Sequence, residues 1–239
     1  DRLRSRGLGD VYKRQLMEGN RVALAILEQV KKAVVGKDEV LAKVLLAILA
    51  RGHILLEDIP GVGKTTLAQA FARAMQLTQN RVQFTPDVLP SDIVGFSLYQ
   101  KETGKFVYHP GAVACNLFLA DEINRTSART QSALLEVMEE GAVTVDGVTY
   151  PLARPFMVLA TQNPVDFVGT YPLPEAQMDR FFMRVSIGYP SQEEEIDILE
   201  RYTSGARPME ELKPICSSQD IVKLQQQVDT VYTLSLIHI

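Results

Sequence analysis

The chain has 239 residues, of which 46% are hydrophobic and 23% charged, with a formal net charge of −4. These values are typical of a globular protein, and the acidic balance with only 7% aromatic residues argues against a dedicated nucleic-acid-binding module. No apolar run approaches the roughly 18 residues of a membrane span, and two cysteines without a C-x-x-C spacing favour reduced thiols in a cytoplasmic protein.

Both ends of the chain differ in character from the rest. Residues 1–15 carry five basic and two acidic side chains but no apolar segment, so they do not match a secretory signal. Residues 234–239 end without a helix cap or a polar terminus. We expect both segments to be non-native tails.

Hydrophobic periodicity predicts helices that alternate with strands. In chain order, the first half is expected to form helix 16–35, helix 38–50 with Asp38 as its cap, strand 53–56, helix 64–75, strand 81–84, and a hairpin of strands 96–99 and 106–108 inside an insertion over 85–110. The second half is expected to form strand 116–120, helix 127–140, a hairpin over 143–150, strand 156–160, helix 175–182, strand 184–187, and helices 193–202 and 219–231. This alternation predicts an α/β fold with a parallel sheet, whose ligand-binding loops follow the carboxyl ends of the strands.

The loop between strand 53–56 and helix 64–75 has the composition of a phosphate-binding loop. Gly61 and Gly63 allow successive backbone N–H groups to turn inward around an anion, and the following helix N-terminus adds donors. Lys64 supplies a positive charge for the β- and γ-phosphates, and the Thr65 hydroxyl can bind Mg²⁺. The strict pattern needs glycine where this chain has Asp58, so an ordinary glycine-rich turn is the alternative here. The candidate nucleotide-binding residues of this loop are Gly61, Val62, Gly63, Lys64, Thr65 and Thr66.

Polar side chains end the two most apolar strands. Asp121 can orient Mg²⁺ or a water bound to it, and Glu122 can polarise or deprotonate the water that attacks a γ-phosphoryl group. Asn163 follows the next buried strand and can hold that water. The alternatives are a solvated loop start for the acidic pair and an ordinary turn residue for Asn163.

Arg180 lies on the helix predicted at 175–182. An arginine that faces the nucleotide of a neighbouring subunit would stabilise charge on the transferring phosphoryl group. A surface salt bridge with Asp179 or Glu175 is the alternative. The histidines have no cysteine or histidine neighbours at ligand spacing, so no zinc site is predicted.

Six stretches, in the same order, resemble the MoxR branch of the AAA+ ATPases, and the resemblance covers about residues 16–231. They are residues 57–65 (EDIPGVGKT), 84–93 (FTPDVLPSDI), 119–125 (LADEINR), 130–136 (TQSALLE), 160–164 (ATQNP) and 169–181 (GTYPLPEAQMDRF). The resemblance implies an AAA+ core with a five-stranded sheet over residues 16–190, a helix-2 insert at 85–110, and the start of a truncated helical lid over 191–233.

The same resemblance implies roles for individual residues. Asp58 becomes a tolerated variant, Asn163 the sensor-1 residue, and Arg180 a finger that acts in trans. Val34, Val35 and Gly36 fall where such proteins hold the adenine. The sensor-2 arginine is expected beyond the end of this chain, which resembles a fragment.

The implied activity is ATP hydrolysis with Mg²⁺ by a ring-forming, usually hexameric, chaperone-like protein. Such proteins remodel or mature protein clients, often with a von Willebrand factor A-type partner. A nucleic-acid motor is the second hypothesis, because related helix-2-insert ATPases include replicative helicases, but the acidic composition counts against it. A non-catalytic nucleotide switch is the third, and the intact Lys64, Asp121, Glu122 and Asn163 count against that.

Overall fold

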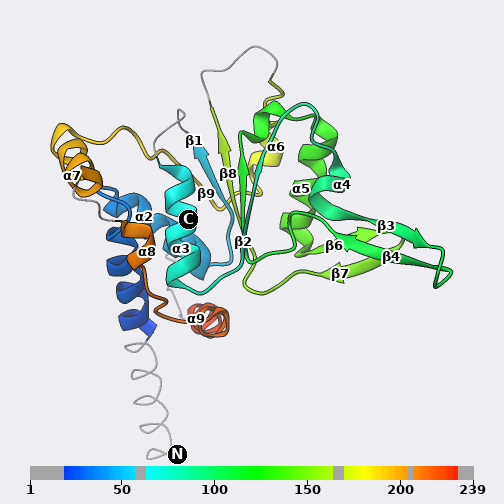
Figure 1. The fold of residues 1–239 in the computed structure, drawn as a ribbon, viewed down its shortest axis with the longest axis horizontal. Helices are drawn as coiled ribbons and strands as arrows, with labels where there is room; N and C mark the ends of the chain where they lie inside the picture. Colours follow the sequence, from blue (N-terminus) through cyan, green and yellow to red (C-terminus); the bar gives the residue numbers. More distant parts are fainter. Residues whose placement is uncertain (1–18, 58–62, 164–169, 204–206, 231–239) are drawn as a thin grey trace, which may run out of the picture.

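A parallel sheet forms the centre of the molecule in the computed structural model, which describes residues 19–57, 63–163, 170–203 and 207–230 (Figure 1). The sheet has five strands in the order β2-β5-β8-β1-β9, and every neighbouring pair is parallel. The strands are β1 (Ile54–Glu57), β2 (Gln79–Gln83), β5 (Leu117–Asp121), β8 (Met157–Gln162) and β9 (Met183–Val185). The predicted five-stranded α/β fold is therefore confirmed.

Helices cover both faces of this sheet (Figure 1). They are the helical residues 19–31, α2 (Asp38–Leu49) and α3 (Lys64–Ala74) on one face, with α4 (Pro90–Val94) and α5 (Ala128–Glu140) on the other. Successive strand residues point to opposite faces, so Leu117 and Leu119 pack with the first group of helices while Phe118 and Ala120 pack with the second. The continuous apolar run of β5 reflects this burial on both faces.

Several predicted helix ends differ in the structure, and the first helix ends at residue 31 rather than 35. Lys37 holds the N-cap position of α2, and Asp38 is the first helical residue rather than the cap. Helix α6 (Glu175–Met178) is shorter than the predicted 175–182. It ends early because the chain must extend to join the sheet: the N–H of Phe182 donates to the carbonyl of His53 at 2.8 Å, directly before β9 begins.

Two antiparallel hairpins extend from the α5 side of the sheet (Figure 1). Strands β3 (Gly95–Gln100) and β4 (Lys105–Pro110) form the first, and β6 (Ala142–Val145) and β7 (Val148–Pro151) form the second. Asp146 and Gly147 have φ of 50° and 78°, as the Asp-Gly turn of a two-residue hairpin requires. The hairpins contact each other through Tyr108 and Tyr150, whose rings stack with centroids 4.0 Å apart.

The C-terminal helices are α7 (Gln192–Thr203), α8 (Pro208–Glu211) and α9 (Ser218–Asp229). The four-residue helix α8 was not predicted, because it is too short to show helical periodicity. Helix α9 packs against α2: Gln225 Nε2 donates to the carbonyl of Ile48 at 2.7 Å, and Arg51 donates two hydrogen bonds to Asp229. None of the helices in the described part of the chain is both long and apolar enough to cross a membrane.

Candidate active site

A cavity of about 380 Å³ lies where β2 and β5 end and α3 begins. Its lining consists of Gly63, Lys64, Thr65, Arg81, Gln83, Asp121 and Glu122. Strands β2 and β5 are hydrogen-bonded neighbours with Gln83 opposite Asp121, so their carboxyl ends open into the same space. The structure thus brings Lys64 and Thr65 together with the acidic pair, although the two groups are more than fifty residues apart in the chain.

The N-terminus of α3 is arranged to receive an anion. Gly63 holds the N-cap position with φ of 88°, a left-handed conformation that glycine adopts without strain. No side chain caps this helix among the described residues, and its first turn contains no acidic residue. The N–H groups of a first helical turn lack intrahelical acceptors and carry a partial positive charge, which favours a phosphate. Gly61 and Val62 lie outside the described residues.

Both oxygens of the Asp121 carboxylate accept hydrogen bonds. Oδ1 accepts from the hydroxyl of Thr161 at 2.7 Å, and Oδ2 accepts from Arg81 Nη2 at 2.7 Å. The hydroxyl of Thr161, a fully buried residue of β8, also accepts a hydrogen bond from the backbone N–H of Glu122 at 2.8 Å. One threonine on the neighbouring strand therefore contacts both acidic residues.

Glu122 follows β5 in a left-handed backbone conformation, with φ of 57° and ψ of 51°. Such a conformation costs a non-glycine residue about 1–2 kcal/mol, and strained backbone of this kind recurs at functional sites. Its Oε2 accepts hydrogen bonds from Gln83 Nε2 at 2.8 Å and from Arg125 Nη1 at 3.0 Å. These contacts fix one carboxylate oxygen of Glu122 at the wall of the cavity.

Asn163 is buried directly after β8, and its backbone carbonyl accepts a hydrogen bond from Asn124 Nδ2 at 3.3 Å. It is not among the described residues that line the cavity. Its position at the carboxyl end of a strand that pairs with both β1 and β5 places it at the predicted edge of the sheet.

Arg180 lies away from this cavity. It donates two hydrogen bonds, from Nε and Nη2, to Glu139 near the end of α5, at 3.0 and 2.7 Å. Two residues later the chain joins the sheet beside the start of β1, whereas α3 follows the other end of β1. The surface ion pair that was predicted as the alternative exists, but its partner is Glu139 rather than Asp179 or Glu175.

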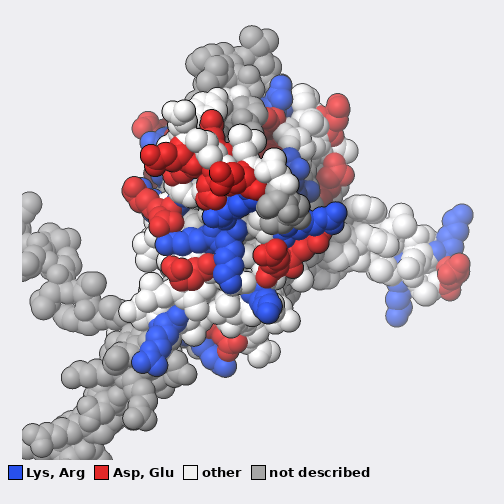
Figure 2. All heavy atoms as spheres, turned by 60° about the vertical axis from the view of Figure 1, so that its left-hand side comes forward, with Lys and Arg blue, Asp and Glu red and all other residues white. Residues whose placement is uncertain are grey.

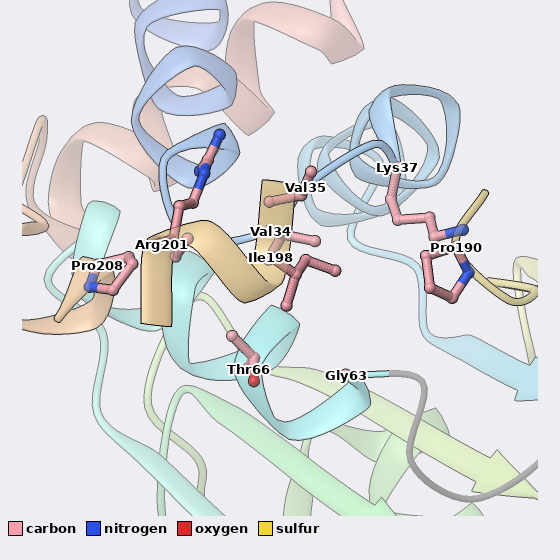
Figure 3. Close-up of a pocket in the computed structure, with 10 residues that line it drawn as sticks. Val34, Val35, Lys37, Gly63, Thr66, Pro190, Ile198, Arg201 and Pro208 are labelled. Carbon is pink, nitrogen blue, oxygen red and sulfur yellow. The ribbon is translucent and has the colours of Figure 1, made fainter. Parts of the chain in front are cut away.

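A second cavity, of about 250 Å³, adjoins the first at Gly63, which lines both (Figure 3). Its walls come from the loop after residue 31, the first turns of α3, and α7 with the segments on either side of it: Ala33, Val34, Val35, Lys37, Gly63, Thr66, Pro190, Ile198, Arg201 and Pro208. Figure 3 shows Val34, Val35 and Ile198 gathered above the first turns of α3. This mainly apolar lining is suited to the flat ring of a nucleobase.

Gly36 lies between Val35 and Lys37, which line the second cavity, but is not itself among the described lining residues. Its φ is 68°, and a Cβ atom there would lie 1.9 Å from Glu194 Oε1 of α7. Two hydrogen bonds hold the same elements together, from Lys37 Nζ to the carbonyl of Tyr189 at 2.9 Å and from Arg201 Nη1 to the carbonyl of Lys32 at 3.0 Å. Val35 thus lines the predicted base pocket, while Gly36 lets α7 approach it.

The oxygen donors of the first cavity fit Mg²⁺. Thr65 offers a hydroxyl and Asp121 a carboxylate, and Mg²⁺ in proteins commonly takes one or two such ligands together with water and phosphate oxygens. Among the described residues, no group of three or more His, Cys, Asp or Glu side chains could hold a metal ion on its own. The arrangement therefore suits an ion that arrives with a nucleotide better than a resident ion in an all-protein site.

Sequence reasoning did not identify Arg81, Gln83 or Thr161. Arg81 and Gln83 are two residues apart on a predicted strand, which places both on one face of the sheet, and this was a usable signal. Thr161 carried no signal of its own, because its contact depends on β8 lying beside β5.

Comparison with known proteins indicates the family to which this chain belongs. The model of the "ATPase family associated with various cellular activities (AAA)" matches residues 53–183. YeaC of Bacillus subtilis, an uncharacterized protein, is 52% identical over 205 residues, which are 86% of this chain and 64% of YeaC. Chaperone MoxR1 of Mycobacterium tuberculosis is 47% identical over 198 residues, which are 83% of this chain and 52% of MoxR1.

Among solved structures, the crystal structure of a candidate ATPase from Cytophaga hutchinsonii aligns with a TM-score of 0.84 and 40% sequence identity. The alignment covers 96% of this chain and 69% of that protein. This chain therefore spans only about half to two thirds of the length of these three proteins. The match over residues 53–183, the sequence identities and the shared fold show that the chain belongs to the MoxR family of AAA+ ATPases.

Proposed function

We propose that this chain binds ATP with Mg²⁺ across the two adjoining cavities and hydrolyses it. One observation carries the proposal: Lys64 and Thr65, at the start of α3, line the same cavity as Asp121 and Glu122. Mg²⁺, when bound, would neutralise the charge that develops on the phosphoryl oxygens during transfer.

The residues have separate roles in this proposal. Gly63 and Lys64, with Gly61 and Val62, bind the phosphates, while Val35, Gly36 and Thr66 form and support the base pocket. Thr65 and Asp121 hold the metal. Glu122 accepts a proton from the attacking water through Oε1, since its Oε2 already accepts two hydrogen bonds. Asn163 orients that water from the end of β8.

We also propose that copies of this protein assemble into a ring, expected to be a hexamer, in which Arg180 reaches the nucleotide of a neighbour. The location of Arg180 near the opposite end of β1 from the chain's own cavity supports a role in trans. An arginine finger supplied in this way contributes about 10³- to 10⁵-fold to the rate.

The work driven by hydrolysis is proposed to be the remodelling or maturation of protein clients, with a von Willebrand factor A-type partner, in the cytoplasm. The name of the M. tuberculosis relative, a chaperone, supports this. The face turned forward in Figure 2 carries basic and acidic side chains interspersed, which is unlike the basic stripe of a nucleic-acid motor.

Two substitutions test the nucleotide site. Lys64→Ala should abolish binding of a fluorescent ATP analogue. Glu122→Gln should bind the analogue like the parental chain but hydrolyse ATP at least about a hundredfold more slowly, because general-base catalysis contributes about 10²–10⁴-fold. Glu102→Gln, at the exposed turn of the β3–β4 hairpin, makes the same change away from the site and should match the parental chain. A Glu122→Gln variant with parental turnover would show that Glu122 is not the base.

Mixing two inactive variants tests the role of Arg180. Arg180→Ala keeps the cavity and lacks the finger, whereas Lys64→Ala keeps the finger and cannot bind nucleotide. If Arg180 acts in trans, a mixture should recover part of the ATPase activity that neither variant shows alone. No recovery at any ratio, with both variants folded and assembled, would contradict this role.

A further inference from the structure

Arg81 occupies a position that the proposed function leaves unexplained. It lies on β2 and lines the first cavity, where the phosphates are expected to bind. Its Nη2 lies 2.7 Å from Asp121 Oδ2 and 3.2 Å from Gln83 Oε1. The Arg81 side chain is 47% exposed, whereas the Asp121 side chain is 14% exposed. A half-exposed, permanently charged guanidinium is therefore placed on a carboxylate that is itself held in position by Thr161.

This contact competes with metal binding by Asp121. A Mg²⁺ ion, or a water in its shell, would approach the oxygens of a carboxylate that already accepts from Arg81 and Thr161. Arginine does not lose its proton in proteins, so the guanidinium would face a divalent cation across one carboxylate group. Repulsion between these charges favours the departure of Arg81 when the metal arrives.

The same cavity offers Arg81 another anion. Lys64 and Thr65 stand across from it at the N-terminus of α3, where the phosphates are expected to lie. A guanidinium fork binds two phosphate oxygens as well as it binds a carboxylate, and the half-exposed side chain has room to turn.

We propose that Arg81 is a phosphate-binding residue which Asp121 restrains in the empty site, and which leaves Asp121 for a phosphate oxygen when Mg²⁺ and nucleotide bind together. The inference rests on the proposed function, because it assumes that the cavity receives a triphosphate. Its consequence is that Arg81 makes nucleotide affinity depend on Mg²⁺, since without the metal Arg81 remains on Asp121.

The first test measures the affinity for a fluorescent ATP analogue, with Mg²⁺ and with a chelator. In Mg²⁺, Arg81→Gln should weaken binding about tenfold, which is the usual effect of losing one charge-assisted hydrogen bond. With the chelator, the same substitution should weaken binding by a clearly smaller factor than in Mg²⁺, because only the charge of Arg81 near the phosphates is lost and no contact with the nucleotide. Arg21→Gln removes the same charge at an exposed position outside both cavities and should have no effect in either condition. Arg81→Ala gives the same pair of measurements if the glutamine variant folds poorly.

The second test releases Arg81 without the metal. Asp121→Asn removes the carboxylate that restrains it, so affinity in the chelator should rise about tenfold. Loss of a negative charge beside the phosphates would also raise affinity, and the double variant separates the two causes. If the gain disappears in Asp121→Asn with Arg81→Gln, Arg81 carries it. If the gain persists without Arg81, the proposal is wrong.

These outcomes are distinct from failure of the proposed function. The proposed phosphate site itself would be contradicted if the parental chain did not bind the analogue, or if Lys64→Ala bound it normally. A different result is that the parental chain binds the analogue and Lys64→Ala abolishes that binding, while Arg81→Gln has the parental affinity in Mg²⁺. That result would refute only the role of Arg81.

Discussion

Thr161→Val is predicted to lower both the stability of the fold and the affinity of the site for Mg²⁺, because one hydroxyl forms hydrogen bonds with both Asp121 and Glu122. Thr161 is fully buried, donates to Asp121 Oδ1 at 2.7 Å and accepts from the N–H of Glu122 at 2.8 Å. Valine has nearly the same shape without the hydroxyl. A hydrogen bond to a charged group contributes about 1.5–3 kcal/mol, and an unsatisfied buried N–H costs about 1–3 kcal/mol. Asp121 keeps some contact with water, so we expect the free energy of unfolding to fall by about 2–4 kcal/mol rather than by the full sum.

Urea denaturation measures the loss of stability, and the Mg²⁺ dependence of ATP hydrolysis measures the damage to the site. Because Thr161 orients a proposed metal ligand, the Mg²⁺ concentration for half-maximal activity should rise about tenfold or more. Thr144→Val makes the same substitution at an exposed hydroxyl, 3.0 Å from the hydroxyl of Thr149, and should change stability by less than about 0.5 kcal/mol. A Thr161→Val variant with the stability and the Mg²⁺ requirement of Thr144→Val would refute this reasoning.

Three further predictions concern the framework of the site. Burial lowers the pKa of His53 below its ordinary value of 6.5, and the ring accepts from the N–H of Val158 while it contacts the carbonyl of Met138. The His53 ring therefore takes up a proton more readily in the unfolded chain than in the folded one, so the free energy of unfolding should fall as the pH drops below about 6.5. Urea denaturation at several pH values should show a shallower fall for His53→Gln than for His109→Gln, which changes an exposed histidine as the control. Gly36→Ala should weaken nucleotide affinity by at least about tenfold in a fluorescence titration, because it combines a left-handed backbone with a contact against Glu194; parental affinity would show that α7 is not needed for the base pocket. Gln76→Gly should raise the thermal midpoint by a few degrees, since Gln76 has φ of 51° directly after α3 and glycine removes about 1 kcal/mol of strain; an unchanged or lower midpoint would contradict this.

Much of the fold could be predicted from local sequence alone. The apolar run before Asp121 and the glycine-rich loop before Lys64 each identify a strand end, and parallel packing brings such ends to one edge. The Asp146-Gly147 turn was equally visible, because its residues are those that tolerate positive φ.

The contacts inside the site could not be predicted, because they depend on the strand order. Arg81 reaches Asp121 because β2 is the neighbour of β5, and Thr161 does so because β8 is the other neighbour. A sequence pattern shows that strands exist but not which strands pair. Likewise, the need for glycine at position 36 becomes clear only when Glu194, far along the chain, is placed against it.

A structure of this protein with Mg²⁺ and a non-hydrolysable ATP analogue would test the central claim most directly. We predict that the triphosphate lies over the N-terminus of α3, with its metal within reach of both Thr65 and Asp121. A triphosphate bound outside this cavity, or a metal ion that contacts neither residue, would contradict the assignment of the site.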